Sequence, residues 1–367
     1  MINLKFFPSR QLAFYMVRLF LTRSFAVLFA LLMVLMTLDL LGEAGKILAV
    51  PGNGDAQLWY YVSLRLPLLV SRFLPFSVLL GTLIAFVGLN QHSEVVAMKA
   101  AGLSAHQILA PLVVASIGIA IGLFAFNEFV VVNSARTVNA WQDNDYKPIP
   151  PASGINTNVW LLSGDDLIRA GFVGGRRSNL TVQRVTIYDR TGGVLQRVIT
   201  AERAVHDEPS RAWKLYGVRI YDANMNVVRH APEMTGMNGI TPDQLTLAKV
   251  DPSELDYWTL KNRIAELEAA GRPAEEAKAG LAHKISGPVS TLLMPLLAAV
   301  AAFGLARSGQ VMVRAVVGMA LGFAYFVADN FSLAMGNAGA YPPLVAAWAP
   351  FFLFLLIGET VLIRTEE

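Results

Sequence analysis

Two arginines within an apolar stretch are the side chains best suited to bind an anion. Arg65 and Arg72 lie seven positions apart in "LRLPLLVSRFLPF", close to two helical turns, so one face of a helix would carry both guanidinium groups. A charge inside a membrane-length segment is costly and marks a ligand or ion pathway by default. We therefore predict contacts with an anionic ligand here, with Lys46 and Arg136 near the same external boundary. For Arg65, the alternative is that its guanidinium reaches the lipid headgroups.

Two aspartates also fall inside apolar runs. Asp39 lies near the outer end of the first run, and Asp329 stands beside Asn330 in a later one. The same cost of a charge in the membrane applies to these carboxylates. Either they take part in function, or they pair with other side chains of the chain and fix the packing of helices. The residues alone leave both interpretations open.

The stretch "NQHSEVVAMKAAGLS" has the signals of a small helix with defined ends. Ser93 is a candidate N-cap, and Glu94 just after it suits the positive end of the helix dipole. Gly102 supplies a C-terminal stop, and "SAHQ" beyond it fits a capping box that starts the next helix. Within about 93–102, the helix between these two end signals would have about eight residues and be roughly 12 Å long. Such a short helix is unstable alone in water and needs a surface to pack on.

This short helix has two chemically different sides. Val95, Met98 and Gly102 share one side, whereas Glu94 and Lys99 lie elsewhere, as their spacing on a helix requires. One interpretation is an interfacial helix that rests on its own bundle. The other is a docking helix that fits a groove on a cytoplasmic partner, with Glu94 as its charged anchor. Both stay open at this point.

The elements that must position these residues are membrane spans. Of the 367 residues, 54% are hydrophobic and 16% are charged, whereas soluble domains have about 45–50% apolar and about 25% charged residues. The apolar runs reach roughly 20 residues, the length that crosses about 30 Å of hydrocarbon. Six spans are predicted, near Leu12–Leu41, Leu64–Leu89, Ile108–Val132, Ile285–Leu305, Ala315–Met335 and Leu344–Ile363.

A polar segment between the third and fourth spans reads as β structure. Strands are predicted at "RVTIYDR", "VLQRVITAER", "AWKLYGVRIYD" and "NVVRHA", which turn signals such as "TGG" separate. The fold class is therefore an α-helical membrane protein with six transmembrane helices (three plus three) and an inserted all-β, jelly-roll-like domain. The domains run over 1–132, 133–258 and 259–367, and a helical connection broken at Gly271 and Pro273 follows the β domain.

The distribution of lysine and arginine near short loops predicts the orientation. The N-terminal segment is basic, whereas the loop over 42–61 holds Lys46 against Glu43 and Asp55. We therefore expect both termini and the short helix to face the cytoplasm. The large β domain is then external, because long domains translocate largely regardless of their charge.

The sequence lacks the motifs for ATP hydrolysis, metal binding and nucleophilic catalysis. The sequence has no G-x-x-x-x-G-K-[ST] phosphate loop, so the chain should not hydrolyse ATP by itself, and no H-E-x-x-H metal motif. It has no cysteine, its five histidines are scattered, and its serines show no nucleophile-elbow context. We expect no metal, no bound cofactor and no catalytic residue in this chain. The net charge of +3 gives no reason to expect nucleic acid as a partner.

A long part of the sequence resembles a known family. The stretch "LPLLVSRFLPFSVLLGTLIAFVGLNQHSEVVAMKAAGLSAHQILAPLV" is similar to the second span, coupling helix and third span of the LptF/LptG lipopolysaccharide-export permeases. The specific parts are the spacing of Pro67, Val70 and Pro75 and the "SEVVAMKAAG" core. "VADNF" and "GAYPPLVAAWAP" look more like the LptG branch than the LptF branch. The order of three spans, a β domain and three spans extends the resemblance over the whole chain.

The resemblance implies a function and partners. Such chains pair with an LptF-like permease, and the two bind a dimer of the cytoplasmic ATPase LptB, which uses ATP and Mg²⁺. The coupling helix enters a groove on that ATPase, with Ser93, Glu94, Val95, Met98, Lys99 and Gly102 as its residues here. Lipopolysaccharide leaves the Gram-negative inner membrane through the permease pair and passes to the periplasmic β domain, LptC and the LptA bridge. Lipopolysaccharide would meet Lys46, Arg65, Arg72 and Arg136.

Three functional hypotheses remain before the structure is considered. The leading one is a non-catalytic permease subunit of an ATP-driven lipopolysaccharide extractor. The second is a membrane-anchored scaffold that presents its external β domain and transports nothing. The cytoplasmic helix separates these two, because a passive scaffold has no need of it. The third, an intramembrane enzyme, lacks a convergent nucleophile, base or metal cluster in the sequence.

Overall fold

The computed structural model divides the chain into two compact units. One unit comprises Met1–Gly45, Gly54–Arg136 and Pro252–Glu367, and the other comprises Lys46–Asn53 and Thr137–Asp251. The structure describes residues 8–148, 156–174, 180–207, 212–223, 226–237, 239–242, 245, 250–269, 272–303 and 311–364.

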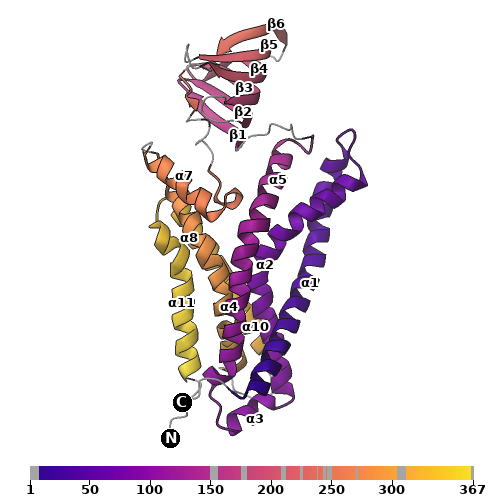
Figure 1. Cartoon of the computed structure of the whole chain (residues 1–367), viewed down its shortest axis with the longest axis vertical. Coiled ribbons are helices and arrows are strands. Elements are labelled where there is room, and N and C mark those ends of the chain that lie inside the picture. The colour runs from indigo at the N-terminus through magenta and orange to yellow at the C-terminus, as the bar shows by residue number, and fades with distance from the viewer. Residues whose placement is uncertain are drawn as a thin grey trace. The chain divides into compact units, whose positions relative to one another are not determined.

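The first unit is built from long apolar helices (Figure 1). In the described residues, six helical segments are long and apolar enough to cross a membrane, which confirms the six predicted spans. Each forms a helix because hydrocarbon offers no partner for an unpaired backbone group. Their parts are α1 (Arg10–Leu48), α2 (Asp55–Gln91), α4 (Ala105–Phe126) with the π-helix η1 (Asn127–Val131) and α5 (Val132–Asp143), α8 (Glu275–Val289) with the 3₁₀ turn η4 (Ser290–Leu292) and α9 (Leu293–Phe303), α10 (Val311–Asn337), and α11 (Pro343–Arg364).

Two short helices join these spans. The helix α3 (Glu94–Ala100) lies between α2 and α4, and α7 (Tyr257–Ala269) precedes α8 after the 3₁₀ turn η3 (Pro252–Glu254). The predicted break in the helical connection is confirmed between the end of α7 and the start of α8, where Pro273 lies. Gly271 and the predicted end of the fourth span at Leu305 fall outside the described residues.

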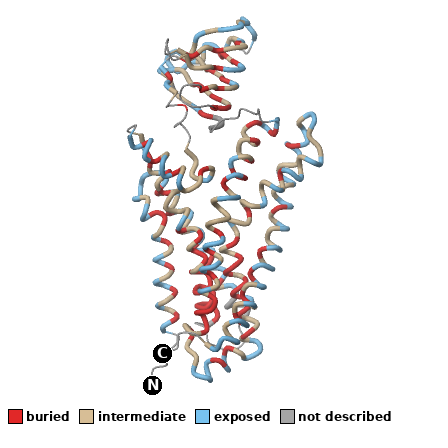
Figure 2. The backbone as a smooth tube through the Cα atoms, in the orientation of Figure 1, coloured by how far each residue is buried: buried red, intermediate tan, exposed pale blue. Residues whose placement is uncertain are grey.

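Burial in the helical unit is concentrated in the half that contains α3 (Figure 2). The largest apolar cluster there joins α1, α2, α3, α4, α9, α10 and α11, and includes Phe20, Leu79, Phe86, Leu112 and Leu297. The first span contributes least, since only 11% of its most apolar window is buried. It therefore lies against the bundle at few points along its length.

The second unit holds one antiparallel sheet. Its strands are β1 (Asn156–Ser163), β2 (Asp166–Gly174), β3 (Thr181–Thr191), β4 (Val194–Asp207), β5 (Ala212–Asp222) and β6 (Val227–Gly236), in sequential order. The inserted all-β domain is confirmed, and the four predicted strands correspond to β3 to β6. The sequence prediction missed β1 and β2. A core that includes Val185, Ile187, Trp213 and Leu215 covers one side of the strands.

A row of irregular residues crosses this sheet. Gly171, Arg184, Glu202 and Gly217 lie opposite one another on β2 to β5, between the regularly paired positions. The backbone φ is +53° at Arg184 and +65° at Gly217. On β3 the buried residues change from Val182 to the opposite parity after Arg184, at Val185 and Ile187. Since neighbours on a strand normally alternate between faces, the row bends the sheet around a single core.

Candidate functional site

The helix α3 has a strained start and a firmly closed end. Ser93 occupies the N-cap position, but its left-handed backbone (φ 58°) makes no side-chain capping bond, because such bonds need an extended N-cap. The predicted N-cap position of Ser93 is therefore confirmed, although its hydroxyl caps no backbone N–H. At the other end, the Leu103 N–H donates to the Met98 carbonyl and the Gly102 N–H donates to the Lys99 carbonyl. These two bonds form a Schellman motif, and Gly102 has the required positive φ of +84°.

One side of α3 packs on the bundle of this chain and the other side does not. Val95 and Met98 are 4% and 8% exposed and belong to the main apolar cluster. Their side chains are thus not available to a partner, which corrects their assignment as docking residues. The outward side contains Val96, which is 64% exposed, and the exposed Lys99. The inward side therefore matches the interpretation of a helix that rests on its own bundle, and docking through the outward side stays a prediction.

The carboxylate of Glu94 is bound to the first span. The Tyr15 hydroxyl of α1 donates to both carboxylate oxygens, at 3.1 and 3.3 Å. Glu94 is partly exposed, so it lies where the inward and outward sides of α3 meet. The predicted charged anchor is therefore already connected to α1.

The start of α4 is fixed by a capping box and by a contact with α11. Ser104 and Gln107 exchange the two bonds of a capping box, at 3.0 and 3.1 Å, which confirms that prediction. His106 Nε2 lies 3.1 Å from Glu359 Oε2 of α11. The segment after α3 is therefore attached to the last span of the same unit.

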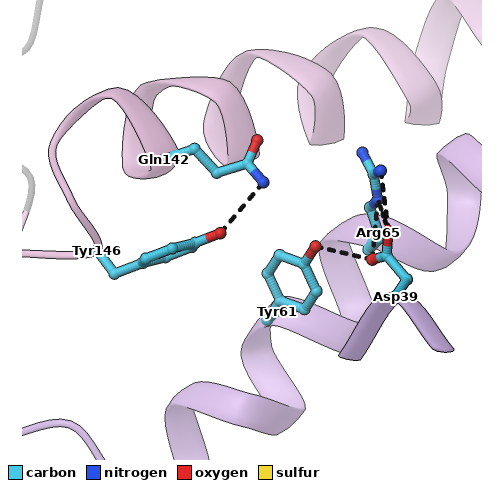
Figure 3. A network of polar contacts seen from close by, with 5 residues as sticks. All are labelled: Asp39, Tyr61, Arg65, Gln142 and Tyr146. Atoms are coloured by element: carbon cyan, nitrogen blue, oxygen red, sulfur yellow. Dashed lines mark hydrogen bonds and ion pairs between the residues drawn. The ribbon is translucent and has the colours of Figure 1, made fainter. Parts of the chain in front are cut away.

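The outer part of α1 is fastened to α2 by a polar cluster (Figure 3). Arg65 donates through Nε and Nη2 to the Asp39 carboxylate at 3.0–3.2 Å, and the Tyr61 hydroxyl donates to it at 2.7 Å. Of the two interpretations of Asp39, the structure shows the internal pairing. Arg65 is correspondingly not a free cation, because the carboxylate compensates its charge. Figure 3 also shows a separate bond of the second unit, from Gln142 Nε2 to the Tyr146 hydroxyl at 3.2 Å.

The other predicted anion-binding residues are all exposed. Arg72 is exposed on α2 and makes no ion pair within the described part of the chain. Arg136 is exposed, and its Nη2 donates to the Glu254 carbonyl at 2.9 Å. Lys46 is exposed and belongs to the second unit, whereas the three arginines belong to the first.

A largely buried ion pair links the third and fourth spans, and the sequence did not predict it. Lys284 Nζ of α8 lies 3.2 Å from Glu128 Oε1, and the two side chains are 12% and 10% exposed. Glu128 also accepts a bond from the Tyr257 N–H at the start of α7. It lies on the π-helix η1, where the neighbouring Asn127 accepts a bond from Ser71 of α2 at 2.6 Å. A π-helix inside a longer helix often marks a functional place.

A separate polar contact joins α8 to the fifth span. His283 Nε2 of α8 lies 4.0 Å from Asp329 Oδ2 of α10, which favours the internal-pairing interpretation of Asp329. The rule that flagged Asp329 applies equally to Glu128, which lies inside the predicted third span. The rule did not select Lys284, because this residue lies one position before the predicted fourth span, which begins at Ile285.

The start of α7 is capped by Asp256. Its carboxylate accepts a bond from the Thr259 N–H at 3.0 Å. Hydrogen bonding by Thr259 lowers the pKa of Asp256 below its ordinary value. The helix α7, which follows the second unit in the sequence, therefore begins at a defined residue, Tyr257. Among the described residues, no group of three His, Asp or Glu side chains has the arrangement of a metal site.

Comparison with known proteins identifies the family. Residues 14–364 match the family model described as lipopolysaccharide export system permease LptF/LptG. The chain belongs to the LptF/LptG family. The LptG permease protein of Escherichia coli K12 is 26% identical over 319 residues, which cover 83% of this chain and 84% of that protein. The LptG permease protein of Haemophilus influenzae is 25% identical over 350 residues, 93% of this chain and 96% of that protein.

Family membership confirms the resemblance seen in the sequence. This member of the LptF/LptG family is a multi-pass inner-membrane protein with an inserted β domain. The relatives are permease proteins, which agrees with a non-catalytic membrane subunit. The contacts around α3, Asp39 and Glu128 therefore belong to a protein of a permease family.

Proposed function

We propose that this chain is the permease subunit of an ATP-driven lipopolysaccharide exporter and that a partner ATPase dimer docks on α3. The second permease is an LptF-like chain, and the lipid passes towards LptC and the LptA bridge. ATP and Mg²⁺ are used by the ATPase, and this chain binds no cofactor. The observation that supports this proposal best is the two-sided helix α3, with Val95 buried and the adjacent Val96 exposed.

The ends of α3 suit it to transmit a force. A Schellman motif closes the helix, a capping box starts α4, and Val95 and Met98 anchor the inward side. A displacement of α3 therefore reaches the bundle through packed side chains and is not absorbed by a flexible loop. The exposed surface that includes Val96 and Lys99 is the one that we assign to the ATPase groove.

The basic residues at the helix ends support an orientation of the chain in the membrane. Figure 1 shows α3 at the same end of the helical unit as the start of α1 and the end of α11. Arg10, Arg18 and Arg364 lie at these helix ends, and basic residues favour the cytoplasmic side. We place both termini and α3 in the cytoplasm. The third span leaves the membrane at its opposite end through α5, so the β domain is periplasmic.

The substrate is an anionic lipid with phosphate groups. Exposed Arg72 and Arg136 offer guanidinium groups, which suit phosphate because they donate paired hydrogen bonds. Lys46 adds a third exposed cation in the other unit. Arg65 joins them only when Asp39 releases it, because the carboxylate now holds its guanidinium.

A matched pair of substitutions tests this function. Val96 on α3 and Val194 on β4 are 64% and 63% exposed, so an aspartate at either place disturbs no core. We expect Val96→Asp to lose the co-purified ATPase and lipopolysaccharide release from proteoliposomes. Val194→Asp should keep both. A complex that keeps its ATPase and its transport with Val96→Asp would contradict the proposal. Purification of the wild-type chain without any ATPase would favour the scaffold hypothesis.

A further inference from the structure

Besides its apolar packing, the first span makes three well-separated close contacts with its own bundle. We propose that α1 is a lever that carries displacement of α3 to the Asp39–Arg65 pair, and that Tyr15 is the positioning residue that connects them. The inference rests on the proposed function, because the displacement comes from the ATPase. It adds the route inside this chain from the docking helix to an anion-binding side chain.

The first attachment is the Tyr15–Glu94 hydrogen bond. The two residues lie 79 positions apart in the sequence, and the single hydroxyl donates a bifurcated bond to the two carboxylate oxygens at 3.1 and 3.3 Å. Glu94 is the first residue of α3, so any movement of this helix pulls on the Tyr15 hydroxyl. A hydrogen bond to a charged group is stronger than one between neutral groups, which suits it to carry such a pull.

The second attachment is a direct backbone contact. A Cβ atom added to Gly81 of α2 would lie 2.4 Å from Ser24 Cα and 2.5 Å from Ser24 N. Ser24 is fully buried at this crossing. Glycine is therefore required here, because the backbones of α1 and α2 approach each other too closely for a Cβ atom. Such a point of close contact allows rotation and resists separation, which are the properties of a pivot.

The third attachment is the cluster of Asp39 with Arg65 and Tyr61. Between the pivot and this cluster, α1 exposes Phe25, Phe29, Met33, Val34 and Leu38. Its other face packs on the bundle, where Leu28 clusters with Leu74 and Leu123. All three attachments lie on one continuous helix, Arg10–Leu48, so a displacement at one end is carried along it as by a rod.

The distances of Tyr15 and Asp39 from the pivot determine how far each residue moves when α1 rotates. At 1.5 Å per residue, Tyr15 is about 14 Å and Asp39 about 22 Å from Ser24 along the helix axis. A rotation about the pivot that shifts Tyr15 by about 1 Å shifts Asp39 by roughly 1.6 Å in the opposite direction. The carboxylate binds Arg65 at 3.0–3.2 Å, so a shift of this size breaks the bonds. Arg65 then becomes available to a lipid phosphate.

The absence of cysteine from the chain makes this movement measurable. Spin labels at Leu41→Cys on α1 and Trp59→Cys on α2 sit on exposed side chains near the third attachment. The distance between them is measured in the full complex with the ATPase, before and after ATP is added. The same preparations give the ATP hydrolysed per lipopolysaccharide released.

Two substitutions with matched controls decide the outcome. Tyr15→Phe removes one hydroxyl, and Tyr341→Phe removes a hydroxyl of equal exposure elsewhere. We expect Tyr15→Phe to keep its bound ATPase, to lose the ATP-dependent distance change, and to use several-fold more ATP per lipid. Gly81→Ala should do the same, whereas Gly88→Ala, where an added Cβ meets nothing within 4 Å, should behave like wild type.

The outcomes separate the lever from the proposed function. An unchanged distance response and ATP use in Tyr15→Phe, with a wild-type complex that transports, would overturn the lever alone. A wild-type complex that binds no ATPase or releases no lipid would overturn the proposed function and the lever with it. If Gly81→Ala does not assemble, Tyr15→Phe still decides, because its side chain lies on the surface of α1.

Discussion

Removal of the Glu128 carboxylate should destabilise the helical unit strongly. Glu128→Ala leaves the Lys284 ammonium without its partner in a place where the two side chains are only 12% and 10% exposed. Loss of one partner of a buried ion pair costs about 3–5 kcal/mol. The Tyr257 N–H also loses its acceptor, which adds about 1–3 kcal/mol if water cannot reach it.

Lys284→Met provides the second arm of a double-mutant cycle. Methionine has a similar length and no charge, and the remaining Glu128 keeps its bond from Tyr257. We expect the double variant to recover about 2–3 kcal/mol relative to the sum of the single variants. As a control, Glu266→Ala breaks the more exposed pair with Arg263 on α7 and should cost less than about 1 kcal/mol.

The assay is the free energy of unfolding of the purified chain in mild detergent, from denaturant titration followed by the helical circular dichroism signal. A Glu128→Ala cost no larger than that of Glu266→Ala would refute the view that this pair is buried and paired. Strict additivity of the two substitutions would show that Glu128 and Lys284 do not interact.

Three further substitutions test local geometry. Gly102→Ala should destabilise the closed end of α3 by about 1–2 kcal/mol, because φ is +84° there; equal protease resistance of the variant and wild type around α3 would contradict this. Gly217→Ala should lower the melting temperature of the β unit, since its Cβ would lie 2.9 Å from Glu202; an unchanged melting temperature would count against the bend. Asp256→Ala should cost about 1 kcal/mol at neutral pH. The folded protein lowers the pKa of Asp256, so this contribution is full above the unfolded pKa and disappears as pH falls through the folded value. A cost that persists in strong acid would contradict the capping role.

The parts of the fold predicted from the sequence are those with local signals. An apolar run of about 20 residues defines a span by itself, and the capping box of Ser104 needs only its own four residues. The strands β1 and β2 were missed because "NTNVWLLS" and "DLIRAGFVG" alternate weakly. The Gly171–Gly217 row was also missed, because it exists only once the strands are in register.

The polar contacts of the candidate site depend on tertiary packing. The rule that charges in spans are functional or paired selected Asp39 and Arg65 correctly, but it could not match them across 26 positions. The Tyr15–Glu94 bond spans 79 positions, and no local pattern marks a tyrosine hydroxyl as a partner. Val95 and Val96 are identical residue types, and only packing decides which one faces the core.

The most direct test of the central claim uses those two valines. A photo-crosslinking amino acid replaces either Val95 or Val96 in cells, and the crosslinked products are identified by mass spectrometry. The account predicts that position 96 captures an ATPase subunit, whereas position 95, buried in the main apolar cluster, captures none. Capture of the ATPase from position 95, or from neither position in cells that export lipopolysaccharide, would contradict the docking of an ATPase on the outward side of α3.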